Sequence, residues 1–251
     1  MTKKVWITGA SSGIGKALSI KFAKEGWQVA ASARRENLLN DLQKNHSNIY
    51  SFPLDVTDLE NSKKVFKKII DQLSEINLCI FSTGTYDPKT EKEINVEHIK
   101  NVFNVNFFGT LNSIKSVEDY FKNKKSGHIA IVSSLVGYRG LPNSTGYTPS
   151  KAALNNLTEG LYFDFKRYDV RISLITPGFI KTPMTDKNTF KMPFLRTPEF
   201  AANKIFDGLV KKKAFEISFP IQISIILKIL KILPNKIYLY LMKKLTKFQK
   251  R

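Results

Sequence analysis

Short apolar runs alternate with amphipathic stretches along the first 220 residues of this 251-residue chain. The apolar runs fall at 5–8, 28–33, 48–54, 77–82, 128–132, 170–176 and 215–219. Helical periodicity occupies 14–25, 36–45, 59–73, 96–121 and 198–213, and a further helix starts near Tyr147. Alternating strand and helix patterns are typical of βαβ units, whose strands are parallel. The pattern therefore predicts an α/β fold with a doubly wound parallel sheet of about seven strands.

A glycine-punctuated turn joins the first predicted strand to the first predicted helix. Its glycines follow a Gly-x-x-x-Gly-x-Gly spacing, which differs from the common G-x-G-x-x-G pattern of dinucleotide sites. Backbone N–H groups of such a turn, together with the positive end of the following helix, bind a pyrophosphate. The candidate phosphate-binding residues are Gly9, Ser11, Ser12, Gly13, Ile14 and Gly15. Considered alone, the segment also fits an ordinary strand-to-helix turn.

Two arginines follow the second predicted strand, at the sheet edge where open α/β sheets bind their ligands. A carboxylate there would bind the 2′-hydroxyl of NAD, whereas guanidinium groups match the 2′-phosphate of NADP. Arg34 and Arg35 therefore favour NADP, with NAD as the other candidate, although Arg35 also fits a solvated position at a helix start. Asp55 ends the third predicted strand, where an adenine amino group can donate to its carboxylate.

The second half of the chain holds the candidate catalytic side chains. Asn and Gly are poor residues for a helix interior, so their clustering at 104–109 predicts a functional kink in the 96–121 helix. Pro149 is tolerated only in the first turn of a helix, which places the helix start near Tyr147. Tyr147 and Lys151 are then four residues apart on one helical face. Ser134 is the second of two serines that directly follow the fifth predicted strand.

Together these motifs resemble the short-chain dehydrogenase/reductase family over about residues 3–220. Residues 8–15 match its TGxxxGxG motif, and Asp55 matches its adenine-contacting aspartate. The resemblance implies a Rossmann-like fold, a nicotinamide cofactor and a catalytic tetrad formed by Asn106, Ser134, Tyr147 and Lys151. The cofactor-binding set that it implies adds Val56, Gly84, Tyr147, Lys151, Pro177, Gly178, Ile180 and Thr182.

Reduction of a carbonyl needs a proton donor for the developing alkoxide and a fixed hydride donor. The ordinary pKa of tyrosine is near 10, and the charge of Lys151 beside Tyr147 is expected to favour the tyrosinate. Ser134 is expected to hydrogen-bond the substrate oxygen and polarise it. The resemblance adds that Lys151 holds the ribose hydroxyls. Asn106 is expected to anchor a water that links Lys151 to solvent, which implies a proton relay.

Two segments depart from the family pattern. The family carries Asn-Asn-Ala-Gly after the fourth strand, where this chain has Phe81-Ser82-Thr83-Gly84. The glycine is kept, but the loss of the asparagines puts the bracing of this strand and the adenosine-side contacts in doubt. Many NADP-preferring members also have Arg or Lys just before the second glycine, where this chain has Ser12. The expected NADP preference therefore depends mainly on the two arginines after the second strand.

Composition and charge limit the cellular compartments and the binding partners that are expected for this chain. The formal net charge is +19, and residues 201–251 hold 12 Lys/Arg against two Asp/Glu. Such a charge suits nucleic acid, anionic lipid or an anionic ligand. Nucleic acid is disfavoured, because the basic residues of the first tail helix alternate with aliphatic rather than stacking aromatic side chains. One cysteine, no signal-peptide pattern and isolated histidines predict a cytoplasmic protein without a disulfide or a metal site.

A segment rich in proline, 181–197, has no clear periodicity and is predicted to form a lid or specificity loop. The candidate substrate pocket combines this loop with the segment after the fifth strand, through Leu135, Leu141, Met184 and Phe190. Apolar walls suit an acyl, isoprenoid or steroid-like substrate better than a sugar phosphate. The alternative is that these side chains only pack the lid.

After residue 220 the chain leaves the ordinary family pattern, which predicts a domain at 1–220 and a basic helical extension at 221–251. Its helices are expected at 221–233 and 235–248, and Ser224, Lys228, Lys231 and Asn235 form one narrow polar stripe on an otherwise apolar surface. About 13 apolar residues span only ~20 Å, so a transmembrane helix is disfavoured. An amphipathic anchor on an anionic membrane surface is favoured, and packing on the domain or on a second subunit is the alternative.

The sequence thus predicts an NADP(H)-dependent oxidoreductase that transfers a hydride between nicotinamide and a carbonyl or secondary alcohol. The substrate is expected to be apolar or lipid-derived, and the protein is expected to be a cytoplasmic homo-oligomer with peripheral membrane association. An NADP-binding scaffold or redox sensor without turnover is the alternative, which the altered segment 81–84 permits and the intact tetrad opposes.

Overall fold

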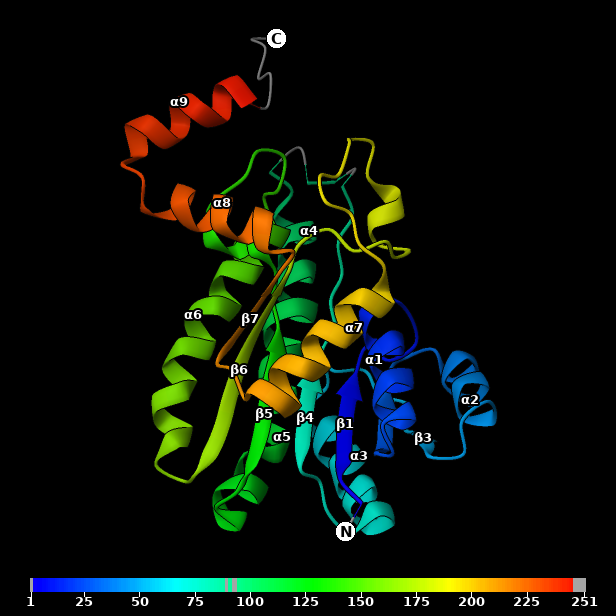
Figure 1. The fold of residues 1–251 in the computed structure, drawn as a ribbon. Helices are drawn as coiled ribbons and strands as arrows, with labels where there is room; N and C mark the ends of the chain where they lie inside the picture. Colours follow the sequence, from blue (N-terminus) through cyan, green and yellow to red (C-terminus); the bar gives the residue numbers. More distant parts are fainter. Residues whose placement is uncertain (1, 89, 92–93, 246–251) are drawn as a thin grey trace.

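The computed structural model describes all residues except 1, 89, 92–93 and 246–251, and within this range seven strands form one parallel sheet (Figure 1). Its strand order is β3-β2-β1-β4-β5-β6-β7. The strands are β1 Lys4–Thr8, β2 Gln28–Ser32, β3 Ile49–Ser51, β4 Leu78–Phe81, β5 Gly127–Val132, β6 Val170–Pro177 and β7 Glu216–Phe219. The α/β fold predicted from the alternating pattern is confirmed.

Helices cover both faces of the sheet. The α-helices of the described residues are α1 Gly13–Lys24, α2 Glu36–Lys44, α3 Leu59–Leu73, α4 Val96–Phe103, α5 Gly109–Lys124, α6 Tyr147–Lys166, α7 Pro198–Phe206, α8 Ile221–Ile232 and α9 Asn235–Leu245, of which the last two lie beyond the sheet edge (Figure 1). Along β1, Val5 and Ile7 pack into the core beneath α1, α2 and α7, whereas Trp6 packs into the core beneath α3, α5 and α6. Alternate residues of a strand point to opposite faces, so a strand buried on both sides is apolar throughout.

The kink predicted within the 96–121 helix is present. Between α4 and α5 the backbone forms a π-helical segment, Asn104–Phe108, and the helix then continues from Gly109. A Cβ on Gly109 would lie 2.6 Å from Cγ2 of Val56, so the glycine lets α5 pack closely against the loop after β3. The wider π turn places Asn106 fully buried on the inner side of the helix.

Two features rise above the carboxyl edge of the sheet, where the site also lies (Figure 1). The first is the segment 181–197, called the lid below. Its helical structure is limited to the short 3₁₀ turn Thr185–Lys187. The second is the tail helix pair α8 and α9, which follows β7 directly. The last predicted helical residues, 246–248, lie outside the described residues. Among the described helices, none is both long and apolar enough to cross a bilayer.

Candidate active site

The glycine turn between β1 and α1 forms one end of the site. Gly9 and Gly13 have φ angles of 70° and 54°, which favour glycine because a Cβ is strained there. A Cβ on Gly15 would lie 2.3 Å from the carbonyl oxygen of Gly9, so the first turn of α1 can pack on β1 only without a side chain. The turn therefore leaves its backbone open to a ligand at the helix N-terminus.

The altered segment after β4 still braces this turn. The backbone N–H of Ser82 donates to Oγ1 of Thr8, over 3.2 Å. A Cβ on Gly9 would lie 2.8 Å from the carbonyl oxygen of Ser82, so the two backbones are in direct contact. Thr8 thus fixes the end of β4, a strand whose bracing the missing asparagines had put in doubt.

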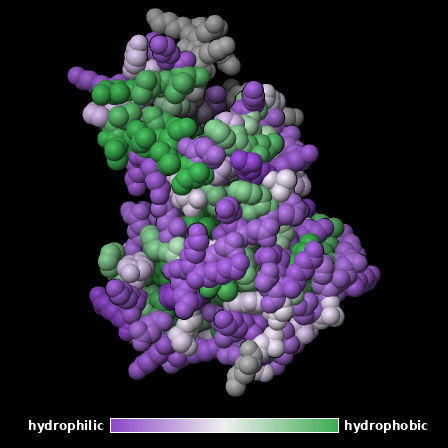
Figure 2. Space-filling model, viewed as in Figure 1, coloured by the Kyte–Doolittle hydropathy of each residue, from purple (hydrophilic) through white to green (hydrophobic). Residues whose placement is uncertain are grey.

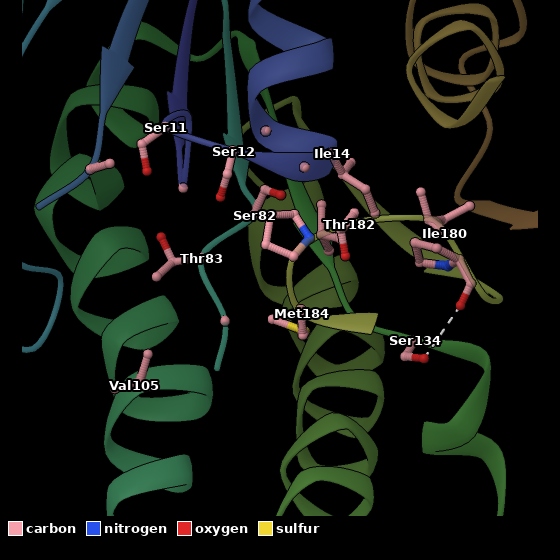
Figure 3. Close-up of a pocket in the computed structure, with 18 of the residues that line it drawn as sticks. Ser11, Ser12, Ile14, Ser82, Thr83, Val105, Ser134, Ile180, Thr182 and Met184 are labelled. Atoms are coloured by element: carbon pink, nitrogen blue, oxygen red, sulfur yellow. Dashed lines mark hydrogen bonds between the residues drawn. The ribbon is translucent and has the colours of Figure 1, made fainter. Parts of the chain in front are cut away.

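A cavity of about 380 Å³ lies at the carboxyl edge of the sheet, and both this turn and the lid line it. Figure 3 shows that the cavity is surrounded by side chains from the glycine turn, from the segments that follow β4 and β5, and from the lid. Of the residues predicted to bind the cofactor, the lining contains Gly9, Ser11, Ser12, Gly13, Ile14, Gly15, Arg34, Arg35, Asp55, Val56, Gly84, Tyr147, Lys151, Pro177, Gly178, Ile180 and Thr182. The whole predicted cofactor set therefore meets at one cavity.

Of the four predicted substrate residues, one lines the cavity. Met184 lines the cavity, but Leu135, Leu141 and Phe190 are not among its lining residues. Leu135 is buried beneath Gly178, and Phe190 is 51% exposed with its ring against Phe179. Residues of a lid cannot be assigned to a pocket from spacing alone, because their neighbours lie far away in the sequence.

Arg35 reaches back from the end of β2 to the glycine turn. Its guanidinium donates to Oγ of Ser11 over 2.8 Å and to Oγ of Ser12 over 2.7 Å. Arg35 is thus an exposed residue at the start of α2 that also contacts the glycine turn. Arg35 thereby places a positive charge beside Ser12. Arg34 lines the same end of the cavity.

Tyr147, Lys151 and Ser134 meet at the other end of the cavity. Tyr147 begins α6, and Nζ of Lys151 lies 5.7 Å from its ring centre. Oγ of Ser134 donates to the carbonyl oxygen of Pro177 over 3.3 Å, shown as a dashed line in Figure 3. Helical spacing thus brings Tyr147 and Lys151 together, as predicted, and β5 adds the serine.

Burial controls the protonation of this pair. Desolvation raises the pKa of Tyr147 to about 12, against the opposing effect of a hydrogen bond with Ser134. Desolvation also lowers the pKa of Lys151 to about 8. Burial of the phenol therefore opposes the expected effect of the Lys151 charge, which is to favour the tyrosinate. Near neutral pH the phenol holds its proton and the amine is charged.

Asn106 lies behind the cavity and organises its wall. Its Oδ1 accepts from the backbone N–H of Thr85 over 2.7 Å, and its Nδ2 donates to Oγ of Ser150 over 3.0 Å. Nζ of Lys151 donates to the carbonyl oxygen of Val132 over 3.2 Å. A Cβ on Gly84 would lie 3.5 Å from Oδ1 of Asn106 and 3.6 Å from Nζ of Lys151. Both polar groups thus face the backbone of Gly84.

Glu91 is a site residue that sequence reasoning missed. Its fully buried carboxylate accepts from the backbone N–H groups of Gly146 and Tyr147, over 2.7 and 3.0 Å, at the start of α6. Nε2 of His98 lies 3.1 Å from its Oε1. A carboxylate at a helix N-terminus is stabilised by the helix dipole and satisfies otherwise unpaired donors. In the sequence, a glutamate within a polar loop looks like any solvent-exposed residue.

Glu91→Ala is expected to lower both stability and kcat. The variant leaves two buried N–H groups unpaired, which costs about 1–3 kcal/mol per group, and it frees the turn that holds Tyr147. Chemical unfolding and steady-state kinetics measure the two effects. Glu91→Gln keeps an acceptor oxygen and should retain most of the activity. Unchanged kcat in the alanine variant would show that Glu91 does not position the tyrosine.

Comparison with known proteins agrees with this geometry. The family model described as short chain dehydrogenase matches residues 3–192. An uncharacterized oxidoreductase of Myxococcus xanthus is 31% identical over 92% of this chain and 93% of its own length. The 3-oxoacyl-(acyl-carrier-protein) reductase FabG of Thermotoga maritima is 34% identical over 72% of this chain and 75% of its own length. The chain therefore belongs to the short-chain dehydrogenase/reductase family and is an NAD(P)-dependent dehydrogenase or reductase.

Solved structures give the same result for the fold. ElxO with NADP bound is 26% identical and superimposes with a TM-score of 0.76 over 87% of this chain and 98% of its own. A short-chain dehydrogenase from Streptomyces avermitilis is 20% identical, with a TM-score of 0.80 over 100% of this chain and 99% of its own. The Rossmann-like sheet and its flanking helices are thus shared with this family.

Proposed function

We propose that this protein is an NADP(H)-dependent oxidoreductase that interconverts an apolar, lipid-derived carbonyl compound and its secondary alcohol. The observation that carries the proposal is the single cavity whose two ends are the glycine turn and the pair Tyr147 and Lys151. One end has the backbone and cationic groups that a phosphorylated dinucleotide needs, and the other has a half-buried phenol beside a buried amine.

The residues fit the cofactor. The glycine turn offers backbone N–H groups without an obstructing Cβ, Asp55 lies at the adenine end, and Lys151 lies beside Gly84 for the ribose. When bound, NADPH supplies the hydride. Tyr147 donates its proton to the carbonyl oxygen as negative charge develops, which its protonated state near neutral pH allows. Ser134 orients and polarises the same oxygen, and the charged Lys151 stabilises the phenolate left behind.

The two arginines support a preference for NADPH over NADH. Arg34→Ala and Arg35→Ala are each expected to weaken NADPH binding roughly tenfold or more, because a charged hydrogen bond contributes about 1.5–3 kcal/mol. NADH lacks the 2′-phosphate, so its affinity should change little. Fluorescence titration of both cofactors measures this difference, with Arg167→Ala, an exposed arginine at the end of α6, as the matched control. Equal wild-type affinities for the two cofactors would refute the preference.

The substrate class is inferred from one residue of the lid and from one relative. Met184 of the lid is apolar and lines the cavity, and the Thermotoga maritima relative is named as a reductase of 3-oxoacyl groups. NADPH oxidation by the purified protein, measured with water-soluble and long-chain ketones, tests both the reaction and the class. Turnover that rises with chain length supports the proposal. Tight NADPH binding without turnover of any carbonyl would favour the scaffold or redox-sensor alternative.

Two properties of the assembly complete the proposal. The protein is taken to be a homo-oligomer, an expectation that follows from its family. It is also taken to associate peripherally with an anionic membrane surface through residues 221–251, which hold eight Lys/Arg and no Asp/Glu. Sedimentation of the purified protein measures the first property.

A further inference from the structure

The tail helices dock on the catalytic domain by their polar side. All four residues of the polar stripe predicted from the sequence contact the domain or are buried against it. Ser224 is 2% exposed, and Nζ of Lys228 pairs with the carboxylate of Glu216 on β7. Nζ of Lys231 lies 5.7 Å from the ring centre of Tyr138. The tail therefore packs on the domain through its polar stripe, whereas the alternative drawn from the sequence had its apolar surface pack there.

Arg139 fixes the junction between the two tail helices. Its Nη1 donates to the carbonyl oxygens of Lys231 and Leu233 at the end of α8, over 2.7 and 3.0 Å. Its Nη2 donates to Oδ1 of Asn235, where α9 begins, over 2.6 Å. The same guanidinium stacks 4.2 Å from the ring centre of Tyr238. A planar, forked donor thus binds both helix ends at once, which holds the tail in one orientation.

The opposite side of the tail is apolar and exposed. Ile221, Ile225, Ile229 and Ile232 recur at helical spacing on the outer face of α8, and they are 51–79% exposed. Leu239, Tyr240 and Leu245 of α9 are 64–69% exposed. Figure 2 shows these helices as a concentrated apolar region on a face that is otherwise mostly polar. An apolar area of this kind on a soluble domain marks an interaction site.

The charge of the tail indicates which kind of partner its apolar face binds. Residues 221–251 contain eight Lys/Arg and no Asp/Glu. Lys236, Lys243 and Lys244 are exposed beside the apolar face of α9. Two copies of the tail meeting face to face would bring like charges together, because a two-fold interface pairs each surface with itself. An anionic phospholipid bilayer instead accepts both the isoleucines and the lysines.

The lid extends this surface toward the cavity. Phe190, Phe194 and Leu195 are 39–51% exposed, and the lid rises from the same edge of the sheet as the tail (Figure 1). The start of α8 reaches the cavity wall, since a Cβ on Gly178 would lie 3.3 Å from Cγ2 of Ile223. Met184 of the lid lines the same cavity.

From this arrangement we infer that the outer faces of α8 and α9, together with the lid, form one surface that lies on an anionic bilayer and turns the cavity mouth toward the lipid. The polar stripe holds the tail on the domain, so the helices bind in the plane of the interface rather than as a flexible tether. Resting on the proposed function, this orientation delivers an apolar carbonyl substrate from the membrane directly to Tyr147.

Vesicle flotation of the full chain tests the surface without substrate or cofactor. The protein should float with phosphatidylcholine vesicles that contain phosphatidylglycerol, and much less with phosphatidylcholine alone. The double variant Ile225→Glu with Ile229→Glu should weaken this partition by about tenfold or more. Phe163→Glu is the matched control, because Phe163 is 67% exposed on α6, away from the tail.

Three outcomes would overturn the inference. They are failure of the wild-type chain to float, unchanged flotation of the double variant, and a shift of that variant from a larger to a smaller oligomer without any vesicle binding. The last outcome would assign the surface to a second copy. Turnover of a water-soluble ketone is measured separately, so a protein that floats but reduces nothing refutes only the proposed function.

A second measurement covers the case in which the double variant does not fold. Tyr240→Trp places a reporter on the exposed face of α9, where the wild-type side chain is 65% exposed. The chain's own tryptophans, Trp6 and Trp27, are buried in the core. Quenching of the new tryptophan by brominated lipid supports insertion of this face. Emission unaffected by brominated lipid contradicts it.

Discussion

Tyr147→Phe is expected to lower kcat by roughly 10²–10⁴-fold, the usual contribution of a positioned general acid. The variant removes only the hydroxyl that donates the proton, while the ring keeps its contact with Tyr86, 5.0 Å away between ring centres. Lys151 and the glycine turn are unchanged, so NADPH affinity should stay close to that of the wild type. Single-turnover NADPH oxidation and fluorescence titration measure the two quantities.

Tyr120→Phe is the matched control for this prediction. Oη of Tyr120 accepts from the backbone N–H of Ile76 over 3.0 Å, on a side of the sheet remote from the cavity lining. That variant should lose some stability and no catalytic rate. A rate close to wild type in Tyr147→Phe would mean that another group donates the proton, and the assigned role of Tyr147 would be wrong.

Gly15→Ala is expected to abolish measurable cofactor binding at ordinary concentrations. The new Cβ would lie 2.3 Å from the carbonyl oxygen of Gly9 and 2.7 Å from its carbonyl carbon, and neither is the movable end of a side chain. The turn must open to relieve the clash, which displaces the N–H groups that face the pyrophosphate. Overpacking of this kind also costs about 1–3 kcal/mol of stability.

Gly160→Ala separates the effect of the clash from that of any glycine replacement. Gly160 lies within α6, and a Cβ there meets nothing within 4 Å. Alanine is the better helix former by roughly 0.5–1 kcal/mol, so this control should raise the unfolding temperature. NADPH titration and thermal unfolding are measured for both variants. Wild-type NADPH affinity in Gly15→Ala would refute the role assigned to the turn.

Sequence reasoning succeeded where the determinants are local. The strands are buried on both faces, so each appears as a short apolar run, and the catalytic pair lies on one helix at a spacing that fixes its geometry. The kink at Asn104–Phe108 could be predicted because Asn and Gly are poor in helix interiors. The cofactor residues follow the carboxyl ends of their strands, which meet at one edge of a parallel sheet.

Sequence reasoning failed where a property of a residue depends on its burial or on partners far away in the sequence. Desolvation raises the pKa of Tyr147, and the spacing of Tyr147 and Lys151 along their helix cannot reveal that burial. Glu91 acquires its role only because the fold brings it to Gly146, 55 residues away. The orientation of the tail depends on Arg139, which lies 91–96 positions before the groups to which it donates hydrogen bonds. Spacing within a helix cannot reveal such contacts.

The strand order also governs how the chain becomes active during synthesis. β1 is central and emerges first, yet its second neighbour, β4, begins only at Leu78. Parallel pairing of Val5 with Leu78 closes a long loop, and such contacts form slowly. The half-sheet of β1 to β4 carries the glycine turn, whereas Tyr147 and Lys151 arrive with α6. All four strands of the nucleotide-facing half therefore leave the ribosome before Tyr147 and Lys151 are available to catalyse a reaction.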